Sequence, residues 1–241
     1  MSQTFKAQRE NEVSFERLAE IFLELQQRGC HNINWVSPTH FVPQLVKSLL
    51  IAAERGLKLP VVYNTNAYDS VEVLKLLDGI VDIYLPDLKY SSDEAGREYS
   101  KVHRYVECSR AAIKEMFRQT SDRLILAGDG LLKRGLVIRL LVLPNDLAGI
   151  AESLEWIRDE LSPRVSVSLM AQYFPANKVG LERYPLLARK IRWGEWAAAI
   201  DQLESFGFEE GWMQDFDSAA EYYRPDFGDA KRPFKDIEDF I

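Results

Sequence analysis

The sequence of 241 residues has little cysteine, little histidine and no long apolar run. Its two cysteines, Cys30 and Cys108, lie far apart, and neither has a second thiol at metal-ligand spacing. Free thiols of this kind are typical of a cytoplasmic protein. The longest apolar runs, such as Leu136–Leu143, are far shorter than the ~20 residues that a membrane span requires. Residues Met1–Asn11 are polar and contain no apolar core of a secretory signal.

The chain also lacks an excess of positive charge, since its net charge is −7 and its isoelectric point is about 5.2. This balance argues against non-specific binding to nucleic acid or to an anionic membrane. Hydrophobic residues make up 46% of the sequence, which is enough for one large domain with its own core. We therefore expect a single α/β domain that binds neither nucleic acid nor membranes.

Helical and extended patterns alternate along most of the chain. Apolar residues at helical spacing predict a helix that begins after its cap Ser14 and ends at Gly29, and a second helix that passes through Leu45–Ala52. A short helix, Val71–Leu77, follows with Asp69 or Ser70 as its cap. Further helices are predicted at Val106–Gln119, Ile150–Ile157 and Trp193–Phe206. Short apolar runs predict strands at Asn32–Ser37, Pro60–Tyr63, Ile80–Leu85, Val137–Leu143 and Val165–Met170. Short connections between the two types indicate parallel strands with right-handed crossovers.

About five core strands are fewer than a closed barrel of the TIM type contains. We therefore predict an open, partial TIM-like barrel. Its first element is a helix, as though the first strand were missing. Leu124–Leu132 predicts a small hairpin around the turn Gly128–Gly130. Residues 1–213 are predicted to form the barrel, and residues 214–241 an acidic, aromatic extension that covers the domain or stays partly disordered.

The ends of the strands carry the polar residues of interest. The apolar run Ile80–Leu85 is followed by Asp87 and Lys89, which an extended backbone points to the same side. Ligand sites of α/β folds lie at this carboxyl end of the strands. The strand Val137–Leu143 contains one cation, Arg139, which needs a carboxylate or a ligand because an unpaired buried charge costs several kcal/mol.

Three segments, His31–Gln44, Leu59–Tyr90 and Arg134–Asn145, resemble the radical S-adenosylmethionine family, and in particular homologues of pyruvate formate-lyase activating enzyme. The similarity extends from about Val13 to about Phe174. It implies a partial (β/α)6 barrel that binds a 4Fe-4S cluster and S-adenosylmethionine. Reductive cleavage of S-adenosylmethionine would give a 5′-deoxyadenosyl radical. That radical would abstract hydrogen from a polypeptide partner, such as a glycyl-radical protein.

The sequence departs from this family in one respect, because it contains no CxxxCxxC motif for the cluster. Cys30 ends a predicted helix and Cys108 lies within another, so neither replaces a ligand of the cluster. As written, the chain is therefore expected to bind no cluster and to be inactive. In relatives the motif lies just ahead of the segment matched by Met1–Val13. The expectation is a start codon assigned too far downstream, or a truncated gene, which translation of the upstream DNA would test.

The resemblance implies cofactor contacts at two strand ends. Ser37, Pro38 and Thr39 correspond to a strand end that meets the methionine amino group of the cofactor; the alternative is a simple turn with Thr39 as a helix cap. Asn64 and Asn66 correspond to a strand end near the adenosyl group or the peptide substrate, and an asparagine-rich turn would have the same sequence.

The resemblance also implies that Asp87 contacts a cation or the cofactor, and that Lys89 contacts the carboxylate of the cofactor or the substrate. The alternative for these two residues is an ion pair. Arg139 pairs either with a cofactor carboxylate or with Asp87. The catalytic residues and metal ligands stay unassigned, and His40 is predicted to be structural.

Two other functions remain open. One is a catalytically silent barrel that acts as a binding or interaction module, and the other is a cluster-free lyase that uses Lys89 as an amine nucleophile. A missing first strand would leave Asn32–Ser37, with Ile33 and Trp35, as an uncovered edge. We expect low stability or a dimer formed through this edge.

Overall fold

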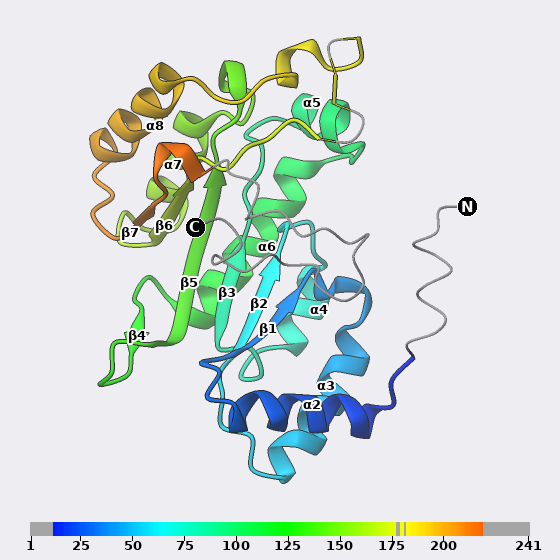
Figure 1. Ribbon diagram of the computed structural model, residues 1–241. Helices are drawn as coiled ribbons and strands as arrows, with labels where there is room; N and C mark the ends of the chain where they lie inside the picture. The colour runs from blue at the N-terminus through cyan, green and yellow to red at the C-terminus, as the bar shows by residue number, and fades with distance from the viewer. Residues whose placement is uncertain (1–11, 177–178, 181, 219–241) are drawn as a thin grey trace, which may run out of the picture.

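The computed structural model describes residues 12–176, 179–180 and 182–218, which form one seven-stranded, mostly parallel sheet alternating with helices (Figure 1). The strands are β1 (Ile33–Val36), β2 (Val61–Thr65), β3 (Ile83–Pro86), β4 (Ile125–Leu126), β5 (Leu132–Leu141), β6 (Ser166–Met170) and β7 (Gly211–Met213). Their order is β1-β2-β3-β5-β6-β7, all parallel, and β4 pairs with β5 in the antiparallel direction. The predicted α/β class is confirmed.

The longer helices are α2 (Phe15–Gln27), α3 (Val42–Glu54), α4 (Val71–Leu76), α6 (Tyr105–Thr120), α7 (Ile150–Glu160) and α8 (Trp193–Ser205). Shorter turns of helix are η1 (Pro38–His40), α5 (Asp93–Ala95), η3 (Pro144–Asp146), η4 (Pro185–Leu187), η5 (Phe216–Ser218) and the π-helical η2 (Gly96–Ser100). Each predicted helix is present. Ser14 caps α2 and Ser70 caps α4 through their hydroxyl oxygens, as their positions in the sequence indicate.

The parallel strands follow one another across the sheet in chain order, so the sheet has no point where the strand order reverses. Right-handed crossovers then place successive helices on the same face. Figure 1 shows α6 behind the sheet, where it contacts β3 and β5. Tyr63, Tyr84 and Ile138 belong to the hydrophobic core shared with the helices. Because side chains alternate along a strand, Asn64 and Arg139 lie on the opposite face.

A buried polar contact fixes α6 to the sheet. The hydroxyl of Tyr84 in β3 donates a hydrogen bond of 2.7 Å to Oε1 of Gln119, whose Nε2 donates to the backbone oxygen of Leu74 in α4. Burial raises the pKa of the Tyr84 hydroxyl well above its usual value. The contact therefore satisfies polar groups from three elements inside the core.

The five predicted core strands are all present, as β1, β2, β3, β5 and β6. In addition, β7 forms a further parallel strand beside β6 that the sequence did not predict. β7 has three residues, Gly211–Met213, and is too short to show a strand period in the sequence. Its Gly211 adopts a φ of 141°, and a Cβ there would meet the backbone oxygen of Val167 at 1.9 Å. Only glycine therefore allows this close pairing of the last two strands.

Two predicted boundaries also change. β2 continues to Thr65, so Asn64 lies within the strand and not in the turn after it. β5 begins at Leu132 because the predicted hairpin around Gly128–Gly130 pairs its first residues with β4. The short strand β4 exposes Ile125 and Leu126.

β1 lies at one edge of the sheet, where its one strand partner among the described residues is β2. The expectation that this strand is an edge strand is confirmed, although the side chains of Ile33 and Trp35 are buried. Both point to the helix-covered face, whereas Val36 points to the other face and is exposed. A dimer through the edge of β1 stays a prediction.

The predicted extension, residues 214–241, lies mostly outside the described residues. Within the part of the chain that the structure describes, no helix is both long and apolar enough to cross a membrane.

Candidate functional site

Three polar side chains from three strands meet at the carboxyl edge of the sheet. Nη2 of Arg139 lies 2.6 Å from Oδ1 of Asp87 and donates a hydrogen bond of 2.6 Å to Oδ1 of Asn64. The sheet positions them, because Asp87 continues β3 and forms an isolated parallel bridge with Arg139 of β5. The sequence predicted each of these residues as a site residue, and the structure brings them together.

Lys89, two residues after Asp87 in the sequence, also belongs to this charged group. Its Nζ lies 2.8 Å from Oδ2 of Asp87, which confirms that the two side chains point to the same side. One carboxylate therefore pairs with two cations, and the three charges sum to +1. Nε of Arg139 is buried and has no hydrogen-bond partner among the residues described. The alternative expected for Arg139, pairing with Asp87, is present.

Tyr105 at the start of α6 holds the backbone of this segment. Its hydroxyl oxygen accepts a hydrogen bond of 2.8 Å from the N–H of Lys89, and its O–H lies 3.1 Å from the backbone oxygen of Asp87. The side chain is buried, and this burial raises the pKa of the Tyr105 hydroxyl. The sequence analysis did not identify Tyr105, because its contact crosses from a helix to a strand end 16 residues earlier.

A second polar centre, also missed, links the ends of β1 and β2. The carboxylate of Asp69, which is 8% exposed, accepts hydrogen bonds from the hydroxyls of Tyr63, Thr65 and Thr39. Burial, followed by the charge of Asp69, raises the pKa of the Tyr63 hydroxyl. The expectation that Asp69 or Ser70 caps α4 is met by Ser70. Thr39 is not a helix cap, because its hydroxyl turns to Asp69.

Ser37 and Asn66 lie at the same edge but do not join the charged group. Ser37 is exposed, adopts a left-handed φ of 50°, and donates its N–H to the backbone oxygen of Asn64 over 2.8 Å. Asn66 is exposed, and its Oδ1 accepts the N–H of Tyr68, so it forms the turn expected as the alternative. Pro38 is buried within η1.

Among the described residues, four of the seven non-glycine positions with a positive φ lie at these strand ends. Left-handed conformations occur at Ser37 after β1, Ala67 after β2, and Asn145 and Asp146 after β5. Each costs of order 1–3 kcal/mol at a residue other than glycine, and such strain is typical of functional sites. This observation supports the carboxyl edge of the sheet as the functional edge.

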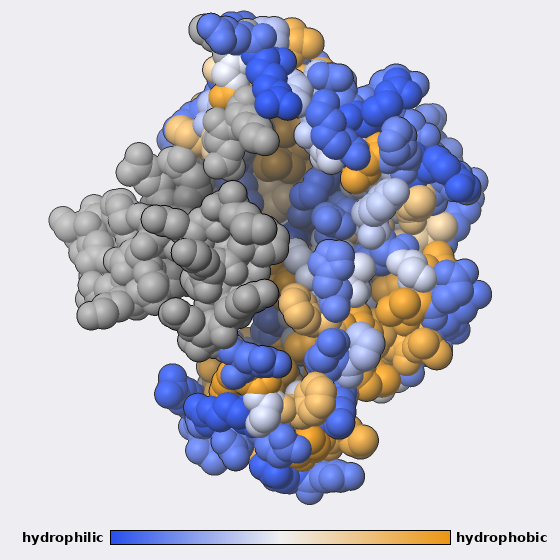
Figure 2. All heavy atoms as spheres, turned by 90° about the vertical axis from the view of Figure 1, so that its right-hand side faces the viewer, coloured by the Kyte–Doolittle hydropathy of each residue, from blue (hydrophilic) through white to orange (hydrophobic). Residues whose placement is uncertain are grey.

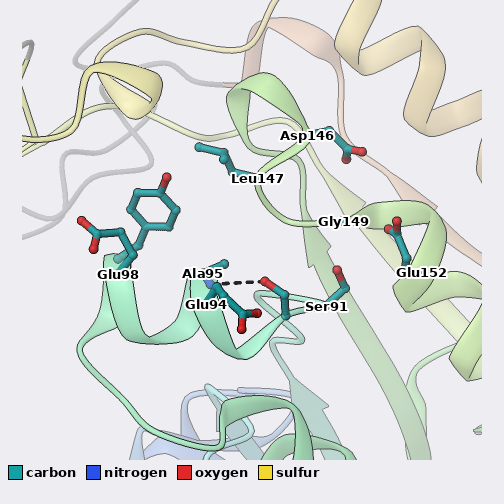
Figure 3. Close-up of a pocket in the computed structure, with 10 residues that line it drawn as sticks. Ser91, Glu94, Ala95, Glu98, Asp146, Leu147, Gly149 and Glu152 are labelled. Atoms are coloured by element: carbon teal, nitrogen blue, oxygen red, sulfur yellow. Dashed lines mark hydrogen bonds between the residues drawn. The ribbon is translucent and has the colours of Figure 1, made fainter.

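Two pockets open near the site. One of about 200 Å³ lies beside Lys89 and has mostly apolar and tyrosine walls. A larger one of about 410 Å³ is acidic: Figure 3 shows Glu94 and Glu98 on one side and Asp146 and Glu152 on the other. Burial raises the pKa of Asp146. On the face turned to the viewer in Figure 2, apolar side chains lie in a hollow between hydrophilic ones.

The loop after β5 is held by Glu195, near the start of α8. Its carboxylate accepts hydrogen bonds from the guanidinium of Arg189 and from the backbone N–H groups of Asn145 and Arg192. Arg189 first, and then these N–H groups, lower the pKa of Glu195 to about 2. The carboxylate thus fixes the rim of the sheet to α8.

The depressed pKa of Glu195 predicts a dependence of stability on pH. The ionised group stabilises the fold fully above its usual pKa near 4.5, and the contribution disappears as pH falls toward about 2. We expect Glu195→Gln to lower the free energy of unfolding at pH 7 by about 2 kcal/mol. Urea unfolding of both proteins at pH 7 and pH 3 measures this, and a difference that does not shrink at pH 3 would contradict it.

The described residues do not fit a 4Fe-4S cluster. Cys30 follows α2 and Cys108 lies within α6, and both are free. Within the described ranges, no three His, Cys, Asp or Glu side chains are grouped so that they could hold a metal ion. A cluster of this type requires several thiolates converging on one point. No chemical step is therefore assigned through a cluster.

Comparison with known proteins identifies a related sequence. No protein-family model matches the chain. The chain is 32% identical over 181 residues to Uncharacterized protein MJ0674 of Methanocaldococcus jannaschii, a match that covers 74% of this chain and 47% of the relative. The chain therefore spans about half the length of that protein. The relative's name states no activity, so the comparison adds a related sequence and no function.

Proposed function

We propose that this chain is a radical S-adenosylmethionine-type protein similar to pyruvate formate-lyase activating enzyme, with its sheet forming an open partial (β/α)6 barrel. Two features support this proposal. The parallel strands follow in chain order without a reversal, as in a barrel. Above all, Asn64, Asp87 and Arg139 converge at the carboxyl edge although the sequence separates Asn64 from Arg139 by 75 residues.

The site has the chemistry to hold the amino-acid end of S-adenosylmethionine. The N–H of Arg139 Nε is buried without a partner among the described residues, so a carboxylate that displaces its cover would satisfy it, and Asp87 is an acceptor for an ammonium or hydroxyl group. Asn64 supplies an amide beside them. The neighbouring strand ends at Ser37–Thr39 and Asn66 complete the proposed binding edge. When bound, S-adenosylmethionine would supply a sulfonium-activated carbon, which these residues would orient.

The test is a titration of the full chain with S-adenosylmethionine in an isothermal calorimeter. We expect binding that weakens roughly tenfold or more in Asn64→Ala and Arg139→Met, because each variant removes a polar contact to a charged ligand. Arg118→Met, at an ion pair on the helical surface, is the matched control and should bind as the unaltered chain does. Absence of binding, or equal affinity in all four proteins, would refute the proposal.

The positions of the two cysteines favour a second candidate, a barrel that binds its ligand without redox chemistry and serves as a binding or interaction module. The chain as written is expected to hold no cluster in either case, so anaerobic reconstitution with iron and sulfide tests the silent module in one direction only. A stoichiometric iron–sulfur cluster would exclude the silent module. The lyase alternative is disfavoured because Lys89, which would have to act as a neutral amine, forms an ion pair with Asp87.

The proposal also covers the cellular location and the partners of the protein. The free cysteines support a cytoplasmic location. The partner would be a glycyl-radical-type protein or another polypeptide, and a second copy of the chain could pair along the edge of β1.

A further inference from the structure

The pocket of about 200 Å³ beside Lys89 lies next to the charged group but is lined by other residues. Its walls include Tyr90, Tyr99, Leu141, Tyr173 and Leu187. Apart from Lys89, none of the side chains expected to hold S-adenosylmethionine lines it. The pocket is therefore a separate feature of the carboxyl edge.

The strand register explains why a cation and an apolar wall meet here. Asp87 lies opposite Arg139, and the N–H of Leu88 donates to the backbone oxygen of Arg139. Two residues further along each chain segment, Lys89 and Leu141 lie side by side on the same face. The pocket thus continues the charged group toward solvent and becomes apolar as it does so.

The tyrosine walls are held in place by their own hydroxyl groups. The hydroxyl oxygens of Tyr90 and Ser100 lie 3.0 Å apart, and the hydroxyl of Tyr173 donates to the backbone oxygen of Leu187 over 2.8 Å. Tyr99 packs against Tyr90 with ring centroids 6.4 Å apart. Tyr99 belongs to η2, a π-helical turn of the kind frequently found at functional sites. These contacts make the pocket a preformed one, which lowers the entropic cost of binding.

The charged group that adjoins the pocket through Lys89 is unbalanced. Lys89 and Arg139 share the single carboxylate of Asp87, so the three side chains together carry a net charge of +1. All three side chains are partly buried, with 36%, 24% and 19% exposed for Lys89, Arg139 and Asp87. Because the two cations are partly buried, they attract an anion more strongly than fully solvated cations would.

We propose that this pocket binds a small monocarboxylate with an apolar body, whose carboxylate meets Lys89 and whose hydrocarbon part fills the tyrosine-lined space. An apolar cavity of about 150 Å³ is sufficient to hold benzene, so the pocket accepts a branched aliphatic group or a phenyl ring. It is smaller than the ~300–1,000 Å³ typical of pockets for drug-sized ligands. The site does not depend on S-adenosylmethionine binding and would hold a second small substrate or effector.

The experiment titrates phenylacetate into the full chain by calorimetry, with saturation-transfer NMR to report which ligand protons touch the protein. We expect phenylacetate to bind through its ring protons, and its neutral analogue phenylacetamide and the small acid acetate to bind roughly tenfold more weakly or not at all. Lys89→Met should weaken phenylacetate binding by a similar factor, while Lys89→Arg retains most of it. Lys58→Met is the matched control, because Lys58 is an exposed lysine that does not line the pocket.

Filling the pocket gives an independent test that leaves the charges in place. Leu141→Phe should weaken phenylacetate binding while acetate binding stays unchanged. The inference is overturned if phenylacetate does not bind, if phenylacetamide binds equally well, or if Lys89→Met binds as the unaltered chain does. S-adenosylmethionine is titrated in parallel. Binding of S-adenosylmethionine without phenylacetate rejects only this inference, and binding of phenylacetate without S-adenosylmethionine rejects only the proposed function.

Discussion

Replacing Asp69 by alanine is expected to lower the free energy of unfolding by about 3–5 kcal/mol. The carboxylate accepts three hydroxyl groups, and two of these, from Tyr63 and Thr65, are buried and would lose their acceptor. A buried donor without a partner keeps its full desolvation cost. Urea unfolding followed by circular dichroism measures the change.

Asp78→Ala is the matched control for Asp69, because Asp78 is also an acid with a hydrogen-bonding partner, Arg118, but lies on the surface. An exposed ion pair contributes at most about 1 kcal/mol. If the free energy of unfolding falls by the same small amount in both alanine variants, Asp69 does not join the ends of β1 and β2 in the way its contacts indicate.

Removing the carboxylate of Asp87 in the variant Asp87→Leu is expected to destabilise the fold by about 3–5 kcal/mol, since it leaves Arg139 partly buried without its counter-ion. Lys89 contributes less to this loss because its side chain extends to solvent. Chemical unfolding at pH 7 measures the change, with S-adenosylmethionine absent from all samples.

The double variant Asp87→Leu/Arg139→Met tests whether the pair, and not the single carboxylate, causes this loss. Replacement of both charges by apolar side chains should recover much of the stability, because no unpaired ion remains. The two single variants and the double variant form a complete cycle whose coupling free energy measures the interaction. A double variant that is less stable than either single one would show that the charges act independently.

These experiments bear on function because Asp87 and Arg139 both stabilise the sheet and form the proposed site. A ligand that binds here must replace contacts that already exist between Arg139, Asp87 and Asn64. The unbalanced positive charge and the unpaired N–H of Arg139 favour an anionic group over a cationic one. Binding and stability can therefore be separated only by variants such as Asn64→Ala, which leave the ion pairs intact.

Local patterns predicted most of the elements correctly. Ser14 and Ser70 were recognisable as helix caps, and the apolar run before Pro86 as a strand, because these signals depend on residues within a few positions of each other. By contrast, β7 was missed because a strand of three residues exists only through its pairing with β6. The position of Asp69 just before a helix predicts only a possible cap, because the three hydroxyl groups that it binds come from two different strand ends.

By itself, the sequence determined the alternation of helices and parallel strands, and it determined that Asp87 and Lys89 share one side of an extended segment. Only the tertiary structure decided that Arg139 lies beside Asp87, that Tyr105 holds their backbone, and that a tyrosine-lined pocket opens at Lys89. The physical reason is the range of the forces involved. Periodicity and capping act over a few residues, whereas the register of β3 against β5 joins segments about 50 residues apart and results from the packing of the whole sheet.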